Sequence, residues 1–566
     1  MSLKSQHQSG PTSSSFMSSR MLAASKIVIA IAALVYHYTY FREKKEPGAC
    51  PDRFNFGDYA LHRQNFVENQ EIYLGECYFP PDYEEGRTRF IQAAQMAGAS
   101  DIRSMPVMEG LTTDLAIFQG SDNYLVHISG THGPEGYLGS AVQFAALQHL
   151  AHTGMYKQRQ PQSRDQSANA TTSLPTIIFI HALNPYGFKY HRRVNEDNVD
   201  LNRNFLSPAE REFVSNLQEN YAGHITLQGA INPTWQPFSN PSITEIYNLV
   251  TAGYYVARYG MHKLKMAMVA GNYKNPKGYA YGGLDYTTSA KNLIDLLIRD
   301  LQLPTRADKL VLIDVHTGLG PSGVDTLLFR EDEAEAEVAG GSTLDILEKI
   351  FPTEYAQNQQ QHHQQHQQKQ QENEEKEREE SGINNSALEL FRSAIGRVQS
   401  MVANSLGSSA DKKPFGALKS SISITRSSST SASSNTNNKN KSNKSNKSKN
   451  GGQSNVAVAV GKGYEQTKGV LSSTFCKDMV APHLMGEDKI CLTQEFGTVS
   501  LAVVGMTAVL DNYAHHYGTP EEKAYFTEKM KNCFYVDTKK WKRRSLHRGM
   551  MLFFQAFDHL QGHHVE

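Results

Sequence analysis

Short apolar runs rich in β-branched residues alternate with longer segments of helical periodicity along much of the chain. Runs of the first kind predict β-strands, and they occupy residues 124–129, 176–182, 310–315 and 490–493. The predicted helices occupy residues 83–97, 134–153, 243–259, 289–301 and 343–350. Strands that alternate with helices are typical of α/β folds, so we expect an α/β domain with a mainly parallel sheet.

A long polar segment, residues 352–463, interrupts this pattern. It begins with Gln, His and Glu, continues with Ser and Asn, and ends in Asn-Lys-Ser repeats. Such sequence cannot bury enough apolar area to offset the entropy lost on ordering it. We interpret it as a disordered insertion into one globular domain, whose two parts are expected at 47–351 and 464–566. A smaller polar insertion occupies residues 158–173.

The N-terminal region has its own pattern. Residues 1–20 are rich in Ser and Gln and are expected to be disordered, and the segment 21–46 contains an apolar and aromatic run at 27–41 with basic residues on both sides. This run is shorter than the 20 or so residues that cross a bilayer comfortably. It fits a membrane anchor, a cleaved signal peptide or, because the first 42 residues contain no acid, a mitochondrial presequence. We expect membrane attachment through 27–41 or entry into the secretory pathway, with mitochondrial import as the alternative.

Composition narrows the function without deciding it. Apolar residues make up 39% of the chain, below the roughly 45–50% of an average globular domain, and the deficit lies in the polar segments. Lys plus Arg and Asp plus Glu both number 57, so charge gives no reason to expect a nucleic-acid partner. Five residues fit the N-glycosylation pattern: Asn169, Asn384, Asn440, Asn443 and Asn446.

The chain contains five cysteines, and no two of them form a CxxC pair. They are Cys50, Cys77, Cys476, Cys491 and Cys533. The spacing argues against a zinc finger or a disulfide framework. We expect mostly buried free thiols, with one or two disulfides as the alternative if the domain faces an oxidising lumen.

Two histidines lie at or just after the carboxyl ends of predicted strands. Ligand sites in open α/β sheets form at these strand ends. His132 comes after the strand at 124–129, and Glu135 lies three residues later, at the start of a helix. His316 ends another strand, and Asp314 lies two residues earlier on the same face, where a carboxylate can orient the imidazole. Imidazole and carboxylate suit zinc, although each motif alone also fits a capping or core histidine.

Two further motifs carry polar side chains toward the same edge. The last predicted strand leads into Glu495, and a carboxylate beside a metal site can move protons during hydrolysis. The loop after the strand at 176–182 contains Arg192, Arg193, Asn202 and Arg203, which can clamp a carboxylate. Taken singly, the Glu495 motif also fits an ordinary acid at the end of a strand, and the arginine-containing loop also fits a solvated basic loop.

The four phrases SGTHGPEGYLGSAVQ, NPYGFKYHRRVNEDNVDLNRNF, DVHTGLGP and EFGT, in this order, resemble the zinc carboxypeptidases. They are equally similar to the related succinylglutamate desuccinylases and aspartoacylases, and most similar to a poorly characterised carboxypeptidase-like subgroup. The resemblance covers most of residues 55–350 and 465–560. It implies a three-layer α/β/α fold with a mixed, mainly parallel central sheet.

The resemblance also implies a metal centre. One Zn²⁺ ion would be held by His132, Glu135 and His316, and Glu495 would act as the general base and acid. The gap of 181 residues between Glu135 and His316 is longer than in typical members. The small polar insertion and the segment 205–310 account for this length.

Substrate contacts follow from the same resemblance. Asn202 and Arg203 match the pair that holds a substrate carboxylate, and Arg193, or its neighbour Arg192, matches the arginine that stabilises the oxyanion. No residue clearly matches the mobile substrate-binding tyrosine of carboxypeptidases, and Tyr281 is only a guess.

The expected function is zinc-dependent hydrolysis of an amide bond next to a carboxylate, by a carboxypeptidase-like metallopeptidase acting on small peptides. One alternative is an aspartoacylase-like deacylase that acts on N-acyl amino acids at the same site. Another is a non-catalytic scaffold with a vestigial site, in which the polar insertion recruits partners.

Overall fold

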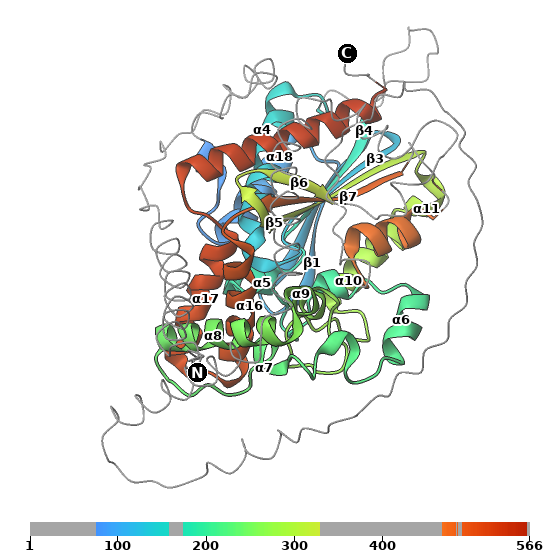
Figure 1. The fold of residues 1–566 in the computed structure, drawn as a ribbon. Coiled ribbons are helices and arrows are strands. Elements are labelled where there is room, and N and C mark those ends of the chain that lie inside the picture. Colours follow the sequence, from blue (N-terminus) through green and yellow to red (C-terminus); the bar gives the residue numbers. More distant parts are fainter. Residues whose placement is uncertain (1–74, 158–173, 329–466, 483, 485–488, 563–566) are drawn as a thin grey trace, which may run out of the picture.

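The structure is a computed structural model that describes residues 75–157, 174–328, 467–482, 484 and 489–562 (Figure 1). The N-terminal segments, the two polar insertions, the helix expected at 343–350 and the five glycosylation acceptors lie outside these residues. Within the described part of the chain, no helix is both long and apolar enough to cross a membrane.

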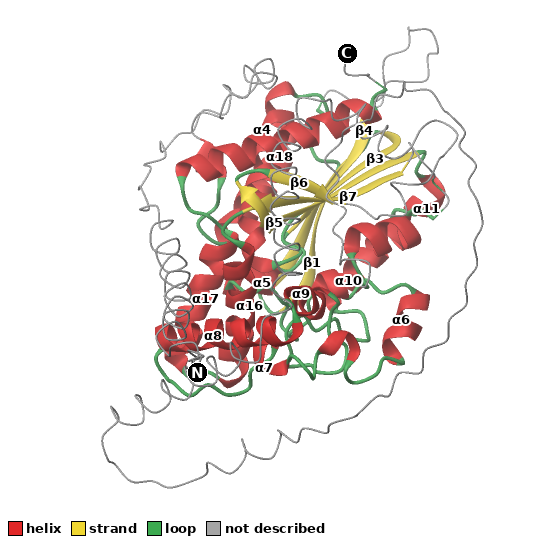
Figure 2. Cartoon of the chain, in the orientation of Figure 1, coloured by secondary structure: helices red, strands yellow, loops and turns green. Residues whose placement is uncertain are grey.

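A mixed sheet forms the centre of the domain, with the strand order β1-β2-β4-β3-β5-β7-β6 (Figure 2). The strands are β1 (Asp101–Met108), β2 (Leu111–Phe118), β3 (Ser121–Ile128), β4 (Pro175–His181), β5 (Lys309–Ser322), β6 (Asp325–Leu328) and β7 (Lys489–Gly497). The four central strands, β4, β3, β5 and β7, are parallel, and the outer ones pair antiparallel. The C-terminal part of the chain thus contributes β7 to the sheet begun by the N-terminal part.

Helices cover both faces of the sheet, which confirms the predicted three-layer α/β/α fold. One face is covered by η3 (Gly75–Tyr78), α3 (Tyr83–Ala97), α4 (Gly136–Thr153) and α18 (Lys539–Leu560). The other is covered by α10 (Thr288–Ile294), η7 (Asp295–Asp300), α11 (Leu303–Arg306) and η8 (Leu471–Val480). Aromatic contacts hold these helices in place: Phe179 of β4 stacks on Phe553 of α18, and Phe475 of η8 stacks on Phe205, which follows η5.

A further group of helices and turns lies beyond the carboxyl ends of the parallel strands. It comprises η4 (Gly133–Glu135), α5 (Pro185–Tyr190), η5 (Leu201–Arg203), α6 (Pro208–Ser215), η6 (Tyr221–Gly223), α7 (Gln228–Ile231), α8 (Pro241–Tyr259), α9 (Met261–Val269), α16 (Leu501–Tyr517) and α17 (Pro520–Phe534). α17 packs against both α16 and α8, and the three lie together at one end of the molecule (Figure 1).

Local sequence explains where these helices begin and end. α3 occupies the range predicted for it, because the Asp82 side chain accepts a hydrogen bond from the Glu85 amide and Gly98, with a φ of 84°, ends the helix. In α17, Thr519 before the helix and Glu522 in its first turn form a reciprocal capping box, and Pro520 is the first helical residue.

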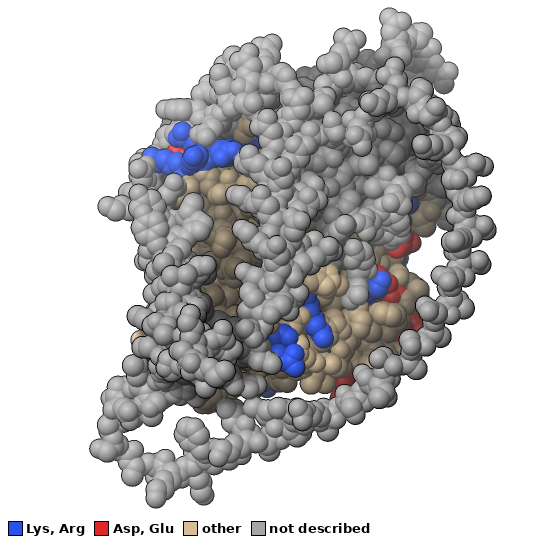
Figure 3. All heavy atoms as spheres, viewed as in Figure 1, with Lys and Arg blue, Asp and Glu red and all other residues tan. Residues whose placement is uncertain are grey.

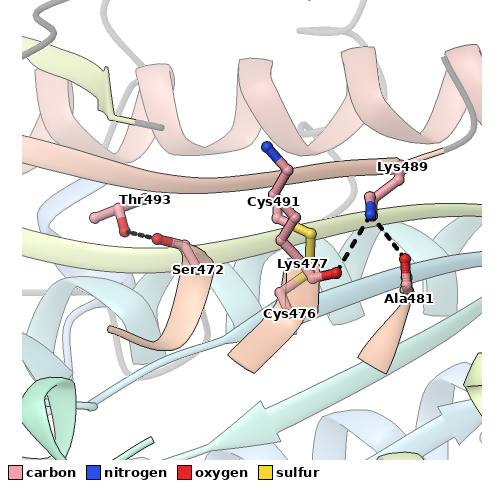
Figure 4. The surroundings of a disulfide bond; sticks show 7 residues. All are labelled: Ser472, Cys476, Lys477, Ala481, Lys489, Cys491 and Thr493. Carbon is pink, nitrogen blue, oxygen red and sulfur yellow. Dashed lines mark hydrogen bonds between the residues drawn. A yellow bond between two sulfur atoms is a disulfide. The ribbon is translucent and has the colours of Figure 1, made fainter. Parts of the chain in front are cut away.

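The cysteines depart from the expectation of free thiols. Cys476 of η8 and Cys491 of β7 form a disulfide (Figure 4), Cys77 is also disulfide-bonded, and Cys533 is buried and free. The expectation was wrong because spacing alone could not show that η8 packs against β7, which brings two cysteines 15 residues apart to a Cα–Cα distance of 6.0 Å.

Candidate metal centre

The first histidine and its neighbouring acid lie in the tight turn between β3 and α4. His132 precedes the short 3₁₀ turn that contains Glu135, and both side chains are buried. This turn touches the backbone of α5, the helix after β4: a Cβ on Gly133 would lie 1.9 Å from the carbonyl carbon of Gly187. Glycine at 133 therefore allows the contact that fixes the direction of His132 and Glu135.

The second histidine comes to the same place along the neighbouring strand. β3 and β5 are parallel neighbours, so His316 on β5 emerges beside His132. His132 Nδ1 lies 2.9 Å from Glu135 Oε1, and His316 Nδ1 lies 2.9 Å from Glu135 Oε2. The two Nδ1 atoms are 3.1 Å apart. Three buried side chains from distant parts of the sequence thus point candidate ligand atoms at one spot.

Two carboxylates hold the far sides of the imidazole rings. His132 Nε2 lies 2.9 Å from Asp200 Oδ1, and His316 Nε2 lies 2.6 Å from Asp314 Oδ2, as the two-residue spacing of the latter pair predicts. Ionised carboxylates only accept hydrogen bonds, so each ring donates its Nε2 proton outward. Thr131 Oγ1 donates to the other oxygen of Asp314 at 2.7 Å and fixes that carboxylate in turn.

The consequence is a site whose chemistry suits a cation. A neutral imidazole that donates from Nε2 has a bare lone pair on Nδ1. In that form, the two lone pairs and the Glu135 carboxylate converge in one buried space that a cation would satisfy. Without a cation, burial would lower the pKa of His316, but Asp314 and Glu135 outweigh it and raise the pKa well above its usual value, so a proton on His316 takes the place of that charge. Donation from the far nitrogen to a carboxylate is also the usual arrangement around metal-bound histidine. The residues present fit a divalent metal ion, which His132, Glu135 and His316 would hold.

The charges of the centre shift the pKa values of its acids. Burial alone would raise the pKa of Glu135, but the neighbouring His132 and His316 outweigh it and hold the pKa well below its usual value. Burial would likewise raise the pKa of Asp200, and the charges of Arg193 and His132 overcome it and keep the pKa low. Both acids are therefore ionised at neutral pH.

The pKa of Glu495 is shifted in the opposite direction, upward. Glu495 lies directly across from His316 in the pairing of β5 with β7, it is 7% exposed, and its Oε1 accepts a hydrogen bond from the Leu319 amide at 2.9 Å. Burial and then the nearby charge of Glu135 raise the pKa of Glu495 to about 8. A carboxyl group beside the centre thus holds a proton at neutral pH in the metal-free protein.

The two adjacent arginines go to different places. Arg193 reaches the centre, with Nε 3.0 Å from Asp200 Oδ2 and Nη1 3.4 Å from Glu135 Oε1. Arg192 turns toward α16, where its Nε lies 3.3 Å from Asp511 Oδ2 in a buried ion pair. The geometry favours Arg193 as the arginine of the site, and Arg192, which was considered with it, holds α16.

The Asn202–Arg203 pair lies on η5, next to Asp200. Arg203 Nε donates to the Val269 carbonyl at 3.2 Å, and its Nη1 donates to the Asn202 carbonyl at 2.6 Å. Asn202 Oδ1 accepts from the Leu471 amide at 2.9 Å, so the C-terminal part of the chain fixes this turn.

Two members of this region were not identified from the sequence. Asp200 was noted only as part of a motif, yet it binds both His132 and Arg193. Tyr279 interacts electrostatically with Arg193, Asp200 and Glu135, and burial raises its pKa. The guessed Tyr281 instead offers its backbone carbonyl to the Asp200 amide at 2.7 Å. The phrase Tyr-Ala-Tyr gave no signal to separate the two tyrosines.

Comparison with known proteins places the chain in a family without assigning its chemistry. No curated protein and no solved structure matches it significantly. The model of one family, DUF2817, described as "protein of unknown function", matches residues 79–380 and 426–548. This match covers well over half of the chain and includes all the residues of the candidate centre, so the protein belongs to the DUF2817 family.

Proposed function

We propose that this protein is a zinc-dependent hydrolase that cleaves an amide bond next to a carboxylate, as a carboxypeptidase-like metallopeptidase. The observation that carries the proposal is the convergence of His132, Glu135 and His316, with both imidazoles oriented by carboxylates. A set of two histidines and one glutamate is typical of catalytic zinc. Zinc held there would polarise the substrate carbonyl and make water more acidic.

The remaining steps belong to the side chains of the protein. Glu495 in its ionised form takes a proton from the attacking water as the new C–O bond forms at the carbonyl carbon. Arg193 donates hydrogen bonds to the oxygen that gains negative charge. When the C–N bond breaks, Glu495 returns the proton to the leaving amine. Asp200 and Asp314 keep both imidazoles in the tautomer that the centre requires.

Substrate selection is assigned to Arg203 and Asn202. A guanidinium can bind a carboxylate through two hydrogen bonds, and its fixed distance from the centre would select the amide bond to be cleaved. The anchoring of Arg203 to two backbone carbonyls leaves it pre-oriented for this role.

The test combines metal analysis with paired substrates. Purified full-length protein should contain about one zinc ion per chain. It should hydrolyse peptides with a free C-terminal carboxylate, or N-acyl amino acids, far faster than the matching carboxamides. Removal of the metal should abolish the activity, and zinc should restore it. Absence of stoichiometric metal, or no hydrolysis of either substrate class by the zinc-loaded protein, would overturn the proposal and favour a scaffold.

A further inference from the structure

The first turns of helix α8, residues 241–248, bury polar side chains and turn apolar ones outward, whereas later in the helix Tyr255, Val256 and Tyr259 pack on a buried apolar cluster. Its buried positions are Pro241, Thr244 and Asn248, whereas Ile243 and Ile246 are 42% and 53% exposed. A surface helix of a globular protein normally shows the reverse arrangement. The reversal indicates that the outward face has a use that offsets its exposure.

Polar contacts hold the helix in this orientation. Glu245 pairs with Lys529 of α17, and Thr244 Oγ1 lies 3.4 Å from Glu522 Oε1 of the same helix. On the next turn, the Asn248 side chain accepts from Gln236 at 3.2 Å. Rotating α8 to bury its isoleucines would break these buried contacts, so the exposure of the apolar face is built into the fold.

Further large apolar side chains that are exposed precede and follow α8 in the chain. Trp235, which is 66% exposed, precedes Gln236, the residue that is bonded to α8. Met261, which is 53% exposed, follows α8 at the start of α9. Together with Ile243 and Ile246, these side chains define what we call the α8 surface.

The same region is basic, although the whole chain has no net charge. Glu245 is the single acid between residues 220 and 277, and its charge faces Lys529 of α17. The basic residues of this stretch are Arg258, Lys263, Lys265, Lys274 and Lys277. Basic side chains gather over α9, and the acidic side chains visible nearby lie further toward α6 (Figure 3).

We propose that the α8 surface docks on an anionic lipid bilayer. Exposed Trp and Ile side chains beside Lys and Arg are the combination by which helices lie in a membrane interface, and each cation near an anionic leaflet adds attraction. A second copy of the chain fits less well, because a symmetric contact would place these basic residues opposite one another. The docked face is distinct from the metal centre, and this proposal does not depend on the proposed hydrolase activity.

The protein carries its own probe for this contact. Its two tryptophans are Trp235 and Trp541, and Trp541 is 3% exposed, with its indole bonded to the Gly497 carbonyl. Emission that responds to lipid therefore reports on Trp235. Full-length protein should show a blue shift and quenching by brominated lipids in vesicles that contain phosphatidylserine, and little of either in phosphatidylcholine alone. Attachment through residues 27–41 alone would occur in both vesicles and leave Trp235 unquenched.

Variants make the test specific. Ile243→Ser with Ile246→Ser should weaken quenching by anionic vesicles by about tenfold or more in lipid concentration. Met96→Ser with Met108→Ser, at positions 50% and 41% exposed on other elements, should leave it unchanged.

A charge variant and a measurement of self-association complete the test. Lys263→Glu should cost roughly fivefold or more in lipid affinity. Equal quenching in both kinds of vesicle, or none in either, would overturn the proposal. So would self-association without lipid that the isoleucine variant abolishes, because the surface would then belong to a second copy.

Discussion

Replacement of Glu495 by Gln tests the electrostatics of the centre directly. In the metal-free protein, burial and the charge of Glu135 raise the pKa of Glu495 from 4.5 to about 8. At about 1.4 kcal/mol per pKa unit, this corresponds to a cost of about 5 kcal/mol for the ionised form. Because the folded protein binds this proton more tightly than the unfolded chain, the stability that Glu495 provides at low pH is lost as the pH rises from 4.5 to about 8.

The glutamine side chain in E495Q cannot ionise, so the stability of this variant does not decrease in this way as the pH rises. Denaturant unfolding of the metal-free proteins should show E495Q more stable than the wild type by about 1 kcal/mol at pH 5 and by about 4 kcal/mol at pH 8. Glu219→Gln changes an exposed acid and should show no such trend. With zinc bound, the difference should shrink, because a cation offsets the charge of Glu135. Metal affinity should persist while turnover is lost.

A stability difference that does not change between pH 5 and 8 would refute this reasoning. It would mean that the carboxyl group at 495 is either hydrated or far from Glu135, and a general base in that position would lose its physical basis. Full activity of E495Q with zinc bound would also rule out Glu495 as the general base, whatever the stability measurements show.

Three other changes test separate parts of the structure. Asp314→Asn should weaken zinc binding about 10–100-fold, measured by competition with a chelator, and an unchanged affinity would show that the bond to His316 does not matter. Tyr279→Phe should lower kcat/KM roughly tenfold with metal content unchanged, whereas Tyr281→Phe should have little effect; the reverse order would restore the original guess. The double variant Cys476→Ser with Cys491→Ser lacks the disulfide, which closes a loop of sequence separation 15. Its free energy of unfolding should be lower by about 3 kcal/mol. Non-reducing peptide mapping of the wild type should find the two cysteines linked.

The four central parallel strands were predicted from the sequence, whereas the antiparallel strands β1, β2 and β6 were not, although β2 is buried. β4 is buried along its whole length and reads as a continuous apolar run. β1 alternates exposed and half-buried positions and contains a proline, and β6 has only four residues. Neither edge strand gives a pattern that differs from a loop, because only one side of each packs on the core.

The candidate site was predictable where one strand end determines it and unpredictable where partners are distant. Asp314 and His316 share a strand face, so their contact follows from spacing. Arg192 and Arg193 are adjacent on a loop, and what separates them is the ion pair of Arg192 with Asp511, 319 residues later. Such a partner becomes visible only when α16 is placed over the loop.

The long gap between Glu135 and His316 is resolved by the order of the sheet. β3 and β5 are neighbours, and among the described residues between β4 and β5 there are helices and turns but no strand, so the added chain leaves the two ligands side by side. Part of this added chain, α8 and α9, forms the basic apolar surface, and its last residue, Val269, accepts the hydrogen bond of Arg203. The segment that lengthens the gap therefore joins the proposed membrane contact to the proposed carboxylate site on η5, beside a metal centre that the sheet itself determines.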